Sequence, residues 1–141
     1  MTSKEKKEEI AELKEMFEKA RKQYSLPSFD ELDEEFEIRK IEDGFVLREI
    51  RRDMLDRLHH YLEWIGPIVN PSQHSMHSMI ESKLFVKKEL EEIFDYYRRL
   101  YYYIHKGILA GLKSEKEEAE FINELWKLYP NLKNPARGIV G

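Results

Sequence analysis

The most distinctive chemistry in the chain lies in the run from Phe94 to Lys106, which reads FDYYRRLYYYIHK. Tyrosine rings can stack on unpaired bases while neighbouring cations neutralise phosphates. Tyrosine and arginine together are also typical of protein-binding hot spots. A third interpretation is core packing, because a tyrosine ring buries apolar area while its hydroxyl reaches water or a partner.

At helical spacing this run divides between two faces. We expect one face to be buried, and it comprises Leu90, Ile93, Tyr97, Leu100, Ile104 and Ile108. We expect the other to reach the surface as the candidate binding site, and it comprises Tyr96, Arg99, Tyr103 and Lys106, with Arg98 and Tyr102 alongside. Arg48, Arg51 and Arg52 of an earlier helix would join this surface if that helix packs next to it. An inward orientation of Tyr96 and Tyr103 would remove its main support.

Histidines provide a second candidate site, for a divalent metal. His74 and His77 are three residues apart with Glu81 four further on, and Asp56, His59 and Glu63 repeat a similar spacing. Separations of three or four put side chains on one helical face, so each set offers ligands. The spacing permits a metal without specifying one, since neither paired Glu-x-x-His motifs nor His-Glu-x-x-His is present.

The sequence gives little sign of catalysis. Serines cluster near the histidines, but none sits in a glycine-flanked elbow, and no glycine-rich phosphate loop occurs. Nucleophilic catalysis needs a base and an orienting acid in space, which these patterns do not indicate. We therefore predict no cofactor and favour a non-catalytic protein.

Composition narrows the class of protein. The chain has 141 residues, no cysteine and a formal charge of -4. This length fits one domain, and the lack of thiols favours a reducing, cytoplasmic setting. The acidic balance argues against a general nucleic-acid binder but leaves room for a local basic patch. No uncharged apolar stretch approaches the roughly 20 residues of a membrane span. The abundance of Glu and Lys fits either heat adaptation or simple helix preference.

The elements that must position these residues are helices. A first helix from Ser3 to Tyr24 carries a narrow heptad-like seam, which either pairs with a partner helix or, as is commoner for so short a segment, packs on the same chain. The Leu26-Pro27 pair breaks it. Ser28 and Glu31 match a capping box, which predicts a short helix through Phe36. From Ile38 to Gly44 we expect a connector with a brief extended piece.

The second half is predicted to hold the longest helices. A helix from Phe45 to Ile65 is stopped or kinked by Gly66-Pro67, and a short helix follows near Gln73. The longest helix spans Val86 to Leu112. Its Gly107 and Gly111 indicate either a close helix crossing or an early end at Gly107. Ser114 and Glu117 cap a final helix that Pro130 ends.

These patterns predict an all-α fold, an antiparallel bundle of four main helices plus two short ones. Residues 1–130 would form one domain and residues 131–141 a flexible tail. The function most consistent with them is a non-catalytic interaction protein with a protein partner or a second copy. RNA or single-stranded nucleic-acid binding and a metal-dependent activity at the histidines are the alternatives.

Overall fold

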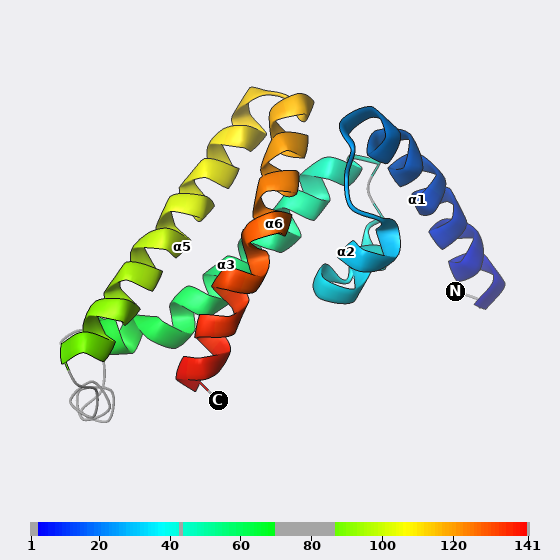
Figure 1. Ribbon diagram of the computed structural model, residues 1–141. Helices are drawn as coiled ribbons and strands as arrows, with labels where there is room; N and C mark the ends of the chain where they lie inside the picture. Colours follow the sequence, from blue (N-terminus) through cyan, green and yellow to red (C-terminus); the bar gives the residue numbers. More distant parts are fainter. Residues whose placement is uncertain (1–2, 43, 70–86, 141) are drawn as a thin grey trace. The chain divides into compact units, whose positions relative to one another are not determined.

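The computed structural model describes residues 3–42, 44–69 and 87–140, and within this part all regular structure is helical. The chain forms α1 (Ser3–Tyr24), α2 (Phe29–Phe36), the 3-10 helix η1 (Ile38–Lys40), α3 (Val46–Val69), α5 (Lys87–Lys113) and α6 (Glu115–Val140) (Figure 1). The all-α prediction is confirmed, whereas the antiparallel arrangement stays a prediction. The helix predicted near Gln73 lies outside the described residues.

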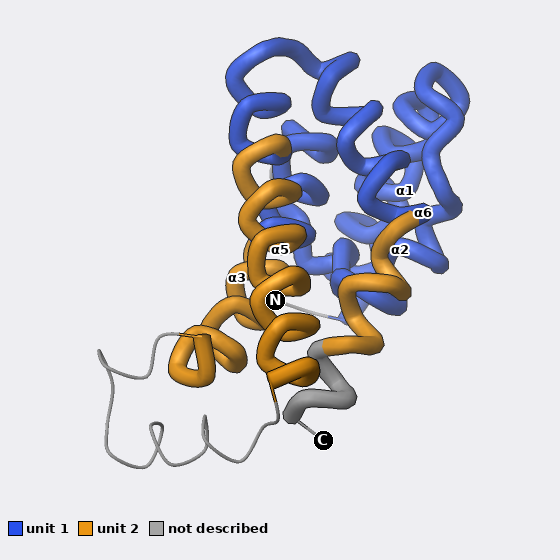
Figure 2. Tube along the Cα trace, turned by 60° about the vertical axis from the view of Figure 1, so that its left-hand side comes forward, with its two compact units in different colours: residues 1–55, 107–127 blue, residues 56–106, 128–141 orange. Residues whose placement is uncertain are grey.

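The chain divides into two compact units (Figure 2). Unit 1 comprises residues 1–55 and 107–127, and unit 2 comprises residues 56–106 and 128–141. Three helices, α3, α5 and α6, therefore contribute residues to both units. The prediction that residues 1–130 form one domain stays a prediction.

In unit 1 the sequence signals for α2 act as expected. The backbone amide of Glu31 donates to Ser28 Oγ over 3.2 Å, which caps the helix at its first turn. Phe29, Leu32 and Phe36 are buried at spacings of three and four. The ring of Phe29 meets that of Phe17 of α1 at 5.7 Å between centroids, and Phe36 meets Trp126 of α6 at 6.4 Å. The apolar faces of α1, α2 and α6 thus share one core.

A left-handed residue, Ser25, ends α1 two residues before Pro27. Ser25 adopts a left-handed conformation with φ 55°, and the amide of Leu26 donates to the carbonyl of Arg21 over 3.2 Å. This is the long-range bond of a Schellman cap, with Leu26 as the accompanying buried residue. Asn123 Nδ2 of α6 also donates to the Tyr24 carbonyl over 2.9 Å, so a second terminal carbonyl of α1 is satisfied.

Gly107 and Gly111 mark a close helix crossing in unit 1. A Cβ on Gly107 would lie 2.6 Å from Leu55 Cδ2 and 2.7 Å from Phe121 Cζ. Only glycine lets α3 and α6 approach α5 this closely. The crossing prediction is confirmed, and the alternative end at Gly107 is wrong because α5 continues to Lys113.

Unit 2 buries tyrosine hydroxyl groups together with its apolar core. The hydroxyls of Tyr61 (α3) and Tyr129 (α6) are 2.7 Å apart, and the Tyr96 hydroxyl of α5 donates to the Leu132 carbonyl over 2.6 Å. Each bond satisfies a hydroxyl that would otherwise be costly to bury. Leu58, Ile65 and Leu100 are fully enclosed in the same unit.

Prolines end fewer helices than the sequence suggested. α3 runs past Pro67 to Val69, and α6 runs through Pro130 and Pro135 to Val140. The prediction that the last helix ends at Pro130 is therefore wrong, because α6 continues to Val140. That residues 131–141 form a flexible tail stays a prediction. A proline removes one helical hydrogen bond, but Tyr129 and Leu132 are buried on either side of Pro130, and this burial offsets the loss. The connector after α2 likewise forms η1 rather than an extended piece.

Candidate interaction surface

The buried face of α5 differs from the predicted one by a rotation about the helix axis. It comprises Ile93, Tyr96, Leu100, Ile104, Gly107 and Ala110. Tyr96, expected at the surface, is 1% exposed, whereas Ile108, expected inside, is 46% exposed. The assignment of Tyr96 to a binding surface is therefore wrong. Burial raises the pKa of Tyr96 far above its usual value, the nearby Tyr61 adds to this, and Arg99 opposes it.

What this rotation brings to the surface is a set of rings that we call the aromatic face of α5: Phe94, Tyr97, Tyr101 and Tyr102. Phe94 is 39% exposed, Tyr101 is 52% and Tyr102 is 59%. Phe94 and Tyr101 lie seven residues apart, and therefore on one side of the helix, with half-buried Tyr97 between them. The rings of Tyr97 and Tyr101 meet edge to face at 4.9 Å between centroids. A hydrogen bond with Tyr101, then burial, raises the pKa of Tyr97.

Cations accompany this aromatic face. Arg98 is exposed and pairs with Asp95 one turn earlier. The Arg99 guanidinium lies 5.9 Å from the centroid of the Tyr96 ring, and Lys106 Nζ lies 5.9 Å from that of Tyr102. The Tyr102 ring in turn meets the half-buried Tyr103 at 5.0 Å. Of the α5 residues that we predicted for binding, all except Tyr96 thus reach solvent at least in part.

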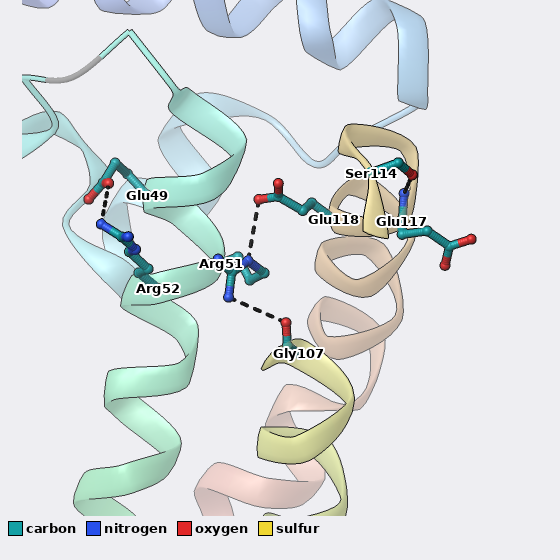
Figure 3. A network of polar contacts seen from close by, with 7 residues as sticks. All are labelled: Glu49, Arg51, Arg52, Gly107, Ser114, Glu117 and Glu118. Carbon is teal, nitrogen blue, oxygen red and sulfur yellow. Dashed lines mark hydrogen bonds and ion pairs between the residues drawn. The ribbon is translucent and has the colours of Figure 1, made fainter. Parts of the chain in front are cut away.

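The α3 arginines that we predicted for the same surface lie in unit 1. Arg51 is largely buried: its side chain is 11% exposed, with Nε 3.3 Å from Glu118 Oε2 and an N–H donated to the Gly107 carbonyl over 3.3 Å (Figure 3). This guanidinium joins α3 to α5 and α6 and is occupied within the unit. Whether the other two, Arg48 and Arg52, extend the α5 surface stays a prediction.

Those two arginines have partners nearby and remain open to solvent. The Arg48 guanidinium lies 4.7 Å from the centroid of the Phe45 ring, and Arg52 donates to Glu49 Oε1 over 3.1 Å (Figure 3). Both side chains are exposed. Their contacts are one-turn neighbours on the helix surface, which contribute little to stability.

Among the described residues, nothing supports the predicted metal site. His59 and Glu63 are exposed, and the ion pair in this region joins His60 Nδ1 to Glu63 Oε2 at 3.7 Å. Across residues 3–42, 44–69 and 87–140, no three potential ligands are grouped closely enough to hold a metal ion. His74, His77 and Glu81 lie outside the described residues.

A cleft of about 440 Å³ opens in unit 1 beside the first turns of α3 and α6. Its lining combines apolar Met16, Ala20 and Phe45 with the carboxylates of Glu115 and Glu118. Glu118 is already paired with Arg51. This lining offers no nucleophile beside a base, the pairing that covalent hydrolysis requires.

The sequence did contain the signal that would have placed the aromatic face. Gly107 must face a neighbouring helix, since its Cβ position is filled. Counting back from it by seven, eleven and fourteen residues gives Leu100, Tyr96 and Ile93, which are all buried. Taking Gly107 as the reference for the buried face would therefore have placed Tyr96 inside.

Protein-family models, curated proteins and solved structures all fail to match this chain. No residue role is therefore carried over from a relative. None of the described helices combines the length and the apolar character of a membrane span. Any function assigned to the aromatic face of α5 must come from the side chains themselves.

Proposed function

We propose that this chain is a non-catalytic helical interaction protein that binds a protein partner through the aromatic face of α5. The supporting observation is the exposure of Phe94, Tyr101 and Tyr102 on one helix beside two exposed arginines. Aromatic residues and arginine are enriched at the centres of protein interfaces and carry much of their binding energy. Clustered exposed apolar rings are otherwise unfavourable on a surface.

The arrangement of these rings suits binding. Tyrosine has few rotatable bonds, so its ring loses little conformational entropy when a partner covers it. The edge-to-face contact of Tyr97 with Tyr101 further restricts both rings before binding. Arg98 and Arg99 lie beside the rings, where charged groups select among partners more than they add affinity.

We also propose an antiparallel arrangement of the main helices and a cytoplasmic location. A single residue, Ser114, separates α5 from α6, and its hydroxyl accepts from the amide of Glu117 over 3.2 Å to cap the second helix (Figure 3). Such short connections are typical of antiparallel neighbours. The absence of cysteine fits a reducing compartment.

The proposed function is tested by affinity capture from an extract of the native source with three versions of the chain. These are the wild type, Tyr101→Glu and Phe45→Glu. The Phe45 ring is 61% exposed at the start of α3 and provides a matched loss of an exposed aromatic elsewhere. We expect a protein that the wild type and Phe45→Glu retain and Tyr101→Glu loses. Equal retention by all three would remove α5 as the binding surface.

One observation favours a second function, the binding of single-stranded nucleic acid. Lys106 lies over the exposed Tyr102 ring, and a ring with an adjacent cation can stack on a base and meet a phosphate. Oligonucleotide binding measured by fluorescence anisotropy at several salt concentrations decides between the two. Affinity that falls steeply with salt and weakens in Lys106→Ala would favour nucleic acid.

A further inference from the structure

We draw no further inference here: the strongest candidate, the aromatic face of α5 in unit 2, belongs to the site already described, and nothing in the structure shows what covers it.

Discussion

At the scale of single residues, the closest packing in unit 1 depends on the absence of a side chain. A Cβ on Gly111 would lie 2.4 Å from Cζ of Arg51 and 2.5 Å from one of its terminal nitrogens. The same guanidinium bonds to Glu118 and to the Gly107 carbonyl. Gly111 therefore provides the space in which a largely buried cation reaches two partners. Removing either partner would leave that charge poorly compensated.

The first prediction concerns this space. Gly111→Ala should lower the free energy of unfolding by about 1 to 3 kcal/mol, because the added methyl displaces the Arg51 guanidinium from its partners. Chemical denaturation measures the change. Gly66→Ala is the matched control, since nothing lies within 4 Å of its Cβ position inside α3. That variant should gain up to about 1 kcal/mol from helix propensity, and an equal loss in both variants would contradict the account.

The second prediction concerns the left-handed residue that ends α1. Ser25 has φ 55°, a conformation that costs a residue with a Cβ about 1 kcal/mol or more. Ser25→Gly should raise the free energy of unfolding by about 1 kcal/mol, partly offset by the greater freedom of the unfolded chain. Ser25→Ala keeps the Cβ and should show no such gain. The thermal midpoints of the two variants and the wild type test this difference.

At the scale of elements, α2 and η1 are joined by one carboxylate. Asp33 accepts from the Arg39 amide over 2.9 Å and from Arg39 Nε over 2.7 Å. Burial pushes the pKa of Asp33 upward, but the side-chain and backbone bonds from Arg39, together with its charge, outweigh burial and lower that pKa overall. The ionised form is thus the one that the folded state prefers.

The third prediction follows from the lowered pKa of Asp33. Because the pKa of Asp33 is lower in the folded state than the unfolded value of about 3.9, its stabilisation is complete above that value and is lost as pH falls through the folded pKa. Asp33→Asn should cost about 1 kcal/mol at pH 7, a modest figure because the Arg39 side chain is 58% exposed. The deficit should shrink at about pH 2. Glu34→Gln, an exposed change on the same helix, serves as the control. A deficit that is the same at both pH values would refute the linkage.

Helix positions were more predictable from sequence than helix rotations and ends. Caps and breakers act locally, so Ser28 and Ser114 placed the starts of α2 and α6 correctly. Pro130 acts locally too, but the burial of Tyr129 and Leu132 by distant segments overrides it. The spacing predicts Tyr97 inside and Tyr96 at the surface, and it cannot separate them by chemistry because both are tyrosines. In the structure Tyr96 lies on the buried face with Gly107, and its hydroxyl donates to the Leu132 carbonyl, a partner far along the chain.

At the scale of the whole molecule, the proposed function depends on which rings of α5 the neighbouring helices leave exposed. Of the two most exposed tyrosines of α5, we predicted Tyr102 for binding but not Tyr101. Exposure depends on which face the neighbouring helices cover, and spacing alone cannot give this.

The fourth prediction is that, with a second copy as the protein partner, the thermal midpoint of the wild type rises with protein concentration. A second copy that binds only folded chains stabilises them by mass action, and each tenfold rise in concentration adds about 1.4 kcal/mol per dimer. Scanning calorimetry at about 10 μM and about 1 mM should therefore show a midpoint higher by several degrees at the greater concentration. In Tyr101→Glu the midpoint should not change. Equal midpoints at both concentrations in the wild type would show that its folded chains do not associate in this range.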